Sequence, residues 1–188
     1  KFFTILNLFL NWEAFVLSKP LVGIVMGSDS DFIIMEETSK VLEQFNVPHE
    51  VLVTSAHRSP ERTRKYVQGA KRRGIQVLIA GAGGAAHLAG VVAAETHLPV
   101  IGVPIDATSL NGLDSLLSTA QMPGGVPVAT VSIGKPGAKN AGLLAVQILA
   151  LSDEKLAGQL IKYKKDQAKA VAQKSKKLKT SHAANFKG

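Results

Sequence analysis

The residues best suited to chemistry in this 188-residue sequence are an imidazole and a guanidinium side by side, His57 and Arg58. They close the segment Ser55-Ala56-His57-Arg58, which follows a short apolar run. An imidazole exchanges protons near neutral pH, and a guanidinium holds phosphate or carboxylate through paired hydrogen bonds. The pair therefore favours proton transfer next to a bound phosphate, although a plain surface histidine explains His57 equally well when it is taken alone.

A second polar segment, Gly27-Ser28-Asp29-Ser30-Asp31, joins an apolar run to a helical stretch. The hydroxyls of Ser28 and Ser30, beside the free N–H groups of a helix start, offer a seat for an anion. Asp31 is suited to accept hydrogen bonds from sugar hydroxyls. Capping alone also explains these residues, since Ser and Asp are preferred N-caps. The segment matches neither the Walker loop nor the Gly-x-Gly-x-x-Gly fingerprint, which weighs against an NTP or NAD site.

The third candidate is the segment 81–86, which contains three Gly and three Ala and is followed by His87 and Leu88. Side chains this small let backbone N–H groups approach a ligand closely, and they equally permit tight packing between helix, sheet or subunits. His49 and His97 have no convergent partners and are expected to be structural. With no Cys and no His-rich spacing, we expect no metal site. The residues of this third segment are Gly81, Ala82, Gly83, Gly84, Ala85 and Ala86.

The elements that position these segments are short apolar runs that alternate with helical stretches. Expected strands cover residues 21–26, 50–53, 76–80, 100–103 and 126–131, and expected helices cover 32–45, 60–73, 87–96 and 138–151. Residues 111–125 are expected to form a loop. This alternation predicts an α/β fold in which helices cover both faces of a parallel sheet. Ligands bind beyond the carboxyl ends of such strands, where the three polar and Gly-rich segments begin.

Length and composition exclude several classes of protein. A chain of 188 residues suits one domain of ordinary size. The absence of Cys excludes a disulfide scaffold, a Cys-ligated metal centre and a thiol nucleophile. An aromatic content of 5% argues against stacking of single-stranded nucleic acid, and the abundant aliphatic residues argue against disorder. We divide the chain into an extension (1–20), a catalytic-type domain (21–151) and a C-terminal helix and tail (152–188).

The formal net charge of +8 belongs to the C-terminal segment. Residues 155–188 carry ten Lys and one acid, whereas residues 1–154 carry 12 basic and 13 acidic side chains. We expect a Lys-rich terminal helix docked by an apolar stripe, with fraying from about Lys174. Binding of an anion or nucleic acid through this tail is a weaker alternative, because no base-reading element accompanies it.

The first 20 residues contain an apolar run, Phe2 to Leu10, that is too short to span a bilayer. A signal peptide is also a poor match, because Trp12 and Glu13 precede Ala14, which offers the only small residue for cleavage. We expect this extension to pack on the body or on a neighbouring subunit. A remnant of a targeting sequence is the second interpretation.

Taken together, four segments of the chain resemble class I carboxyaminoimidazole ribonucleotide mutase, also called phosphoribosylaminoimidazole carboxylase, of purine biosynthesis. The resemblance runs from about Leu21 to Leu151. The segments that carry it are Met26-Gly27-Ser28-Asp29-Ser30-Asp31, Ser55-Ala56-His57-Arg58, Gly81-Ala82-Gly83-Gly84-Ala85-Ala86-His87-Leu88 and Gln121-Met122-Pro123-Gly124-Gly125-Val126-Pro127-Val128-Ala129-Thr130.

The resemblance implies a flavodoxin-like, three-layer α/β/α domain that assembles into a cytoplasmic homo-octamer and needs no metal or other cofactor. It further implies that a carboxylate moves from the exocyclic nitrogen of an aminoimidazole ribonucleotide to ring carbon 4, with His57 as the proton shuttle. A functional link to the ATP-dependent carboxyaminoimidazole ribonucleotide synthase follows, and neither nucleic acid nor membrane is an expected partner. The implied contacts are Ser28, Ser30, Asp31 and Arg58 with the ribose phosphate, and Ser55, Ala56, Gly81, Ala82, Gly83, Gly84, Ala85, His87 and Leu88 with the base and carboxylate.

Ala89 departs from the family pattern, which usually has Pro after His-Leu. Pro restrains its own torsion and that of the preceding residue, so Ala89 relaxes the backbone next to the expected pocket. Ala89 is the only support for one alternative to a mutase, a non-catalytic module that binds a phosphosugar. A second alternative is the same fold used as a direct carboxylase, which takes free aminoimidazole ribonucleotide and carbon dioxide.

Overall fold

A computed structural model of the chain describes the backbone of residues 19–185 and side chains through residue 178. The chain divides into two compact units, Lys1–Ile148 and Leu149–Gly188. The first unit contains all strands and the second contains the last helix. No helix within the described part of the chain is long and apolar enough to cross a membrane.

Five parallel strands form one sheet in the order β2-β1-β3-β4-β5. The register pairs Met26 at the end of β1 with Val53 of β2 and Gly81 of β3, so the segments that follow these strands leave the same edge. Further along, Gly83 of β3 pairs with Ile105, the last residue of β4. The strands are β1 (Val22–Met26), β2 (His49–Val53), β3 (Val77–Gly83), β4 (Val100–Ile105) and β5 (Ala129–Thr130).

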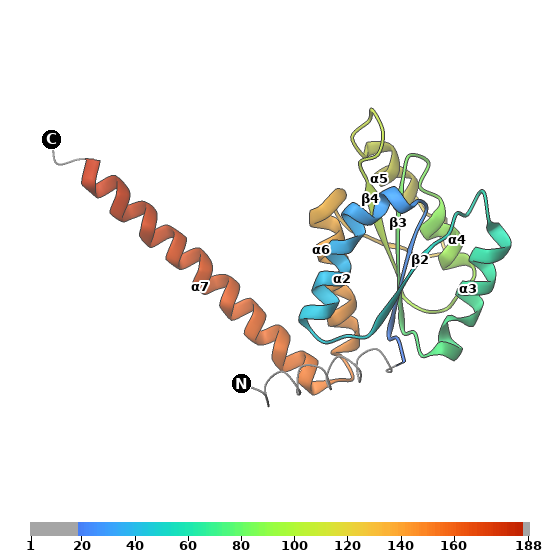
Figure 1. Ribbon diagram of the computed structural model, residues 1–188, viewed down its shortest axis with the longest axis horizontal. Coiled ribbons are helices and arrows are strands. Elements are labelled where there is room, and N and C mark those ends of the chain that lie inside the picture. The colour runs from blue at the N-terminus through green and yellow to red at the C-terminus, as the bar shows by residue number, and fades with distance from the viewer. Residues whose placement is uncertain (1–18, 186–188) are drawn as a thin grey trace, which may run out of the picture. The chain divides into compact units, whose positions relative to one another are not determined.

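Helices cover both faces of this sheet, which confirms the three-layer α/β/α fold predicted from the sequence. In Figure 1, α2 and α6 lie on one side of the strands, and α3 and α4 lie on the other. Gly142 of α6 packs so closely on α2 that an added Cβ would lie 2.9 Å from the Cβ of Val41. The helices are α2 (Phe32–Gln44), α3 (Pro60–Arg73), α4 (Leu88–Ala94), α5 (Leu113–Ala120), α6 (Gly134–Leu149) and α7 (Glu154–Asn185), and a single 3-10 turn, η1 (Asp29–Asp31), precedes α2.

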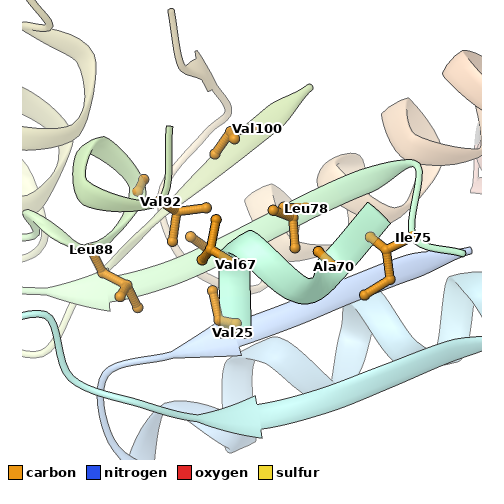
Figure 2. Close-up of a cluster of buried hydrophobic side chains, with 10 residues drawn as sticks. Val25, Val67, Ala70, Ile75, Leu78, Leu88, Val92 and Val100 are labelled. Atoms are coloured by element: carbon orange, nitrogen blue, oxygen red, sulfur yellow. The ribbon is translucent and has the colours of Figure 1, made fainter. Parts of the chain in front are cut away.

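The core between the sheet and α3/α4 is aliphatic and closely packed (Figure 2). Val25 and Leu78 from the strands meet Val67 of α3 and Val92 of α4, and each of these side chains is at most 1% exposed. Burial of side chains of this size stabilises a fold by roughly 1.5–3 kcal/mol each. The core therefore holds the strand ends, and with them the polar segments, in fixed positions.

The structure differs from the sequence prediction in the segment that follows β4. Residues 111–125 were expected to form one loop, but Leu113–Ala120 is helix α5. The fifth strand is also shorter than expected: β5 contains Ala129 and Thr130 alone. Pro127, which lacks an N–H group, lies two residues before β5 and cannot donate to a strand ladder there.

The C-terminal unit contains a helix that is longer than expected. The helix α7 continues past Lys174, where fraying was expected, to Asn185. Its exposed apolar side chains include Ile161, Val171 and Leu178. The expectation that the first 20 residues pack on the body concerns residues 1–18 in the main, and these lie outside the described residues.

Candidate active site

A pocket of about 410 Å³ opens at the carboxyl edge of the sheet. This volume is within the range of small-molecule sites, which is about 300–1,000 Å³. Four segments line it, each directly following or ending one of the strands β1 to β4. The lining residues are Gly27, Ser28, Ser30, Asp31, Ser55, Ala56, His57, Arg58, Ala82, Gly83, Gly84, Ala85, His87, Leu88, Ala107 and Thr108.

The segment after β1 is held by hydrogen bonds among its own side chains. The Asp31 carboxylate accepts from the backbone N–H of Ser28 at 3.0 Å, and the Ser28 hydroxyl accepts from the N–H of Ser30 at 3.4 Å, which together make a capping box. Ser30 Oγ also donates to Ser28 Oγ at 2.9 Å. Capping, the simpler interpretation of these residues, is therefore present, and it places the same hydroxyls in the lining of the pocket.

Asp31 is the one buried carboxylate in the lining, with 6% of its surface exposed. Burial raises the pKa of Asp31 above its ordinary value of 3.8, while the backbone N–H groups of Ser28 and Gly27 act in the opposite direction. Burial removes water from the Asp31 carboxylate, and no cation among its described partners takes the place of that water. Its oxygens can therefore accept strong hydrogen bonds from the hydroxyl groups of a ligand.

Arg58 connects the segments that follow β1 and β2. Its Nη2 donates to the carbonyl of Gly27 at 3.1 Å, and its backbone N–H donates to the Ser55 hydroxyl at 3.1 Å. The side chain is exposed and lines the pocket, and its Nε lies 3.5 Å from Ser55 Oγ. The hydroxyls after β1 and this guanidinium lie in one pocket, as the sequence predicted.

His57 contacts a second imidazole from the segment after β3. Its Nε2 lies 2.9 Å from Nδ1 of His87, and the two rings meet edge to face with centroids 5.0 Å apart. At this separation the two nitrogens share a hydrogen bond, in which one donates its proton and the other is the acceptor. The contact therefore orients the His57 ring and leaves its Nδ1 for other partners.

The Gly- and Ala-rich segment runs from the end of β3 into the pocket. Ala82, Gly83, Gly84 and Ala85 line the pocket, followed by His87 and Leu88 at the start of α4. Gly81 does not line it: this residue lies inside β3, where an added Cβ would clash with Met35. All the other site residues predicted from the sequence are brought together.

Three residues of the lining were missed by sequence reasoning: Gly27, Ala107 and Thr108. Ala107 and Thr108 follow β4, and the pairing of Gly83 with Ile105 brings them beside Gly83 and Gly84. The signal was the same as for the other segments, namely small or polar residues directly after a buried strand. Ala89, which departs from the family pattern, lies buried in the first turn of α4.

Comparisons with known proteins agree with this geometry. The AIR carboxylase family matches residues 21–170. The N5-carboxyaminoimidazole ribonucleotide mutase of Pyrococcus horikoshii is 56% identical over 160 residues, which cover 85% of this chain and 89% of that protein. The mutase of Bacillus subtilis is also 56% identical, over 85% of this chain and 99% of its own. The crystal structure of Treponema denticola PurE superposes with a TM-score of 0.76 at 29% identity, covering 85% of this chain and 98% of that one.

Proposed function

This chain belongs to the AIR carboxylase family, and from that premise we propose that it converts N5-carboxyaminoimidazole ribonucleotide to 4-carboxy-5-aminoimidazole ribonucleotide in purine biosynthesis. The relatives from Pyrococcus and Bacillus carry the name of this mutase, and the match extends over 89% and 99% of their lengths. The observation that carries the proposal is the position of His57, whose ring stands in one pocket with hydroxyls, a guanidinium and a small-residue wall.

The ribose phosphate binds, in this proposal, to the side of the pocket that follows β1. Arg58 supplies the positive charge, and the hydroxyls of Ser28 and Ser30 supply neutral donors to phosphate oxygens. The buried carboxylate of Asp31 accepts hydrogen bonds from the ribose hydroxyls. This division explains why a carboxylate and a guanidinium occur in the same lining without an ion pair to each other among the described contacts.

The aminoimidazole and its carboxylate then lie against the Gly- and Ala-rich wall and His57. In the proposed reaction the bond between the exocyclic nitrogen and the carboxylate carbon breaks, and carbon dioxide is held in the pocket. Ring carbon 4 attacks the carbon dioxide and forms the new carbon–carbon bond. One proton must reach the departing nitrogen, and one must leave carbon 4. A single imidazole performs both transfers, so no cofactor is required by this scheme.

Small side chains on the wall support this scheme for a physical reason. Retention of carbon dioxide next to carbon 4 keeps the reacting atoms at a high effective concentration, and exclusion of water prevents its loss by hydration. The residues Ala82, Gly83 and Gly84 leave space for a flat ring and a linear molecule to lie close to the backbone.

An isomerisation assay tests the proposal. Purified protein receives N5-carboxyaminoimidazole ribonucleotide without ATP or metal, and the ring-carboxylated product is followed by ultraviolet absorbance. We expect rapid conversion by the wild type and a loss of about 10²- to 10⁴-fold in kcat for His57→Asn, the range for general acid–base catalysis. His97→Asn is the matched control, because His97 contacts Lys71 outside the pocket and should leave kcat unchanged.

The other outcomes of this assay identify the alternatives. Turnover only with free aminoimidazole ribonucleotide and bicarbonate would assign a direct carboxylase. Nucleotide binding by the folded protein without either reaction would assign a phosphosugar-binding module, with Ala89→Pro as the next variant. Normal turnover by His57→Asn would reject the proton shuttle.

We also propose that the chain assembles into a homo-octamer. Large apolar side chains stand half exposed on the first unit, and self-association would remove them from water. They are Phe32, Ile33, Leu110, Leu113 and Leu117, each between 45% and 65% exposed. Mass measurement by light scattering tests the octamer, and a monomer at assay concentration would contradict it.

Two further proposals follow from the assigned reaction alone. The substrate is an N-carboxylated ribonucleotide, so we propose a functional link to the ATP-dependent carboxyaminoimidazole ribonucleotide synthase. We also propose a cytoplasmic location, which a fluorescent fusion to the full-length protein would test. Neither nucleic acid nor a membrane is proposed as a partner.

A further inference from the structure

The helix α5 buries hydroxyl side chains and exposes leucines, which is the reverse of the usual pattern for a surface helix. Ser115 and Thr119 are at most 2% exposed, whereas Leu113 and Leu117 are 52% and 50% exposed. Amphipathic helices normally bury their leucines and leave hydroxyls in water. A helix with buried hydroxyls needs partners for them, and these partners indicate what the buried face does.

The buried face of α5 holds the two ends of the segment that joins it to β4. Ser115 Oγ lies 2.9 Å from the carbonyl oxygens of both Ile105 and Gly112. At the first turn, the Thr108 hydroxyl donates to the Asp114 carboxylate at 2.6 Å, which lowers the pKa of Asp114. Thr108 lines the pocket. One helix face therefore fixes the segment after β4.

Ser118, on the same face, reaches the segment after β3. Its hydroxyl oxygen accepts a hydrogen bond from the backbone N–H of Ala86 at 2.9 Å. Its own proton is best placed for the carbonyl of Asp114, one turn earlier in α5, at 2.7 Å. The Ala86 side chain is 1% exposed, so its peptide has little access to solvent. Ser118 thus ties the Gly- and Ala-rich segment to a rigid helix.

The N–H group that Ser118 holds belongs to Ala86, the residue directly before His87. His87 Nδ1 is in turn 2.9 Å from Nε2 of His57, the proposed proton shuttle. A displacement of Ala86 moves the backbone of His87, and with it the nitrogen that orients the His57 ring. Ser118 is therefore linked to the reacting imidazole through its hydrogen bond to Ala86, the backbone from Ala86 to His87, and the hydrogen bond between the two imidazoles.

We propose that Ser118 is a positioning residue for the reaction: it fixes the peptide of Ala86, and thereby the contact between His87 and His57. This inference rests on the proposed function, because its kinetic test measures the proposed isomerisation. The described contacts of Ser118 do not reach the phosphate side of the pocket, so we expect its effect to be larger on turnover than on binding. A purely structural role would lower stability alone.

Three variants test the proposal. Ser118→Ala removes the hydroxyl oxygen that accepts from the N–H of Ala86. Ser118→Thr keeps a hydroxyl, and a helical Thr can still donate it to a carbonyl of the preceding turn. Thr38→Ala is the matched control. It removes a fully buried hydroxyl that donates to the carbonyl of Ala138 at 2.8 Å, between α2 and α6 and outside the pocket lining.

For each variant kcat, KM and the thermal midpoint are measured. Ser118→Ala should lower kcat on the order of 10- to 100-fold, because small misplacements of catalytic groups have effects of this size, with KM within about threefold of wild type. Ser118→Thr should restore most of kcat. Thr38→Ala should lower the thermal midpoint and leave kcat unchanged.

A kcat for Ser118→Ala equal to that of Thr38→Ala would overturn the proposal, as would a change confined to KM. A crystal structure of Ser118→Ala provides a readout that does not depend on activity. The distance from His57 Nε2 to His87 Nδ1 should lengthen, and an unchanged distance would also overturn the inference. If wild-type protein shows no isomerisation, the proposed function fails, and this distance still decides the role of Ser118.

Discussion

At the scale of single residues, the pocket retains a carboxylate whose burial opposes its ionisation. Asp31 is almost fully buried and accepts backbone N–H groups, but no cation is among its described hydrogen-bond or ion-pair partners. Residues of this kind are kept for function, and their replacement commonly raises stability while it lowers activity.

Asp31→Asn should therefore separate stability from binding. Because burial raises the pKa of Asp31, its contribution to stability is fully present below its ordinary value of 3.8 and is lost as pH rises through the folded value. The asparagine of the variant does not ionise, so the variant does not lose stability in this way. The difference in free energy of unfolding between the variant and wild type, measured in urea, should therefore grow in favour of the variant from acidic to neutral pH. Its kcat/KM should fall by roughly tenfold, since a hydrogen bond to a charged acceptor is replaced by a neutral one.

A constant difference in unfolding free energy across that pH range would contradict the assignment of Asp31 as a destabilising carboxylate. Asp29→Asn is the control, because Asp29 is exposed in the same segment.

Residue types were sufficient to predict most of the pocket. The hydroxyls, His57 and Arg58 stand after buried strands, and the parallel sheet brings strand ends together. Gly81 was predicted as a site residue but does not line the pocket, whereas Thr108 lines the pocket without having been predicted. Their positions depend on how far β3 and β4 extend and on the pairing of Gly83 with Ile105, which are properties of the register and not of residue type.

At the scale of elements, α5 shows why local sequence patterns were not sufficient. Its sequence has Ser and Thr where a surface helix would bury apolar residues, and the segment was expected to form a loop. The hydroxyls find their partners in segments 10 to 33 residues away, such as Ile105 and Ala86. Tertiary hydrogen bonds therefore override the weak helix preference of these residues. By contrast, α3 was predicted to the residue, and α2 ends one residue before its expected end.

Two helical glycines should respond oppositely to the same substitution. Gly142→Ala places a methyl group 2.9 Å from Val41 Cβ and should lower the free energy of unfolding by about 1–3 kcal/mol. Gly158→Ala in α7 meets nothing within 4 Å and should stabilise its helix by about 0.5–1 kcal/mol. Urea unfolding followed by circular dichroism measures both. Equal effects of the two substitutions would contradict the close packing of α2 on α6.

At the scale of the whole molecule, the activity and the charge belong to different units. The pocket lies within the first unit, and the Lys-rich α7 lies within the second. The family match ends at residue 170, so the residues beyond it are not part of the shared sequence.

Removal of residues 174–188 should leave catalysis and assembly intact. The truncated chain keeps every residue of the pocket and of the family match. We expect kcat/KM within about twofold of the full chain, as for a change distant from the site, and the same mass by light scattering. A large loss of activity would assign a functional role to the tail and favour the anion-binding alternative.

The separation of charge also changes how the molecule behaves on charged supports. The full chain has a formal charge of +8 and a sequence isoelectric point near 9.8, yet residues 1–154 carry 12 basic and 13 acidic side chains. A chain cleaved near the start of α7 thus has almost no net charge. Retention on a cation exchanger reports whether α7 is intact and says little about the enzyme itself. Material that flows through such a column still contains every residue of the pocket but lacks the part of the family match that lies in α7.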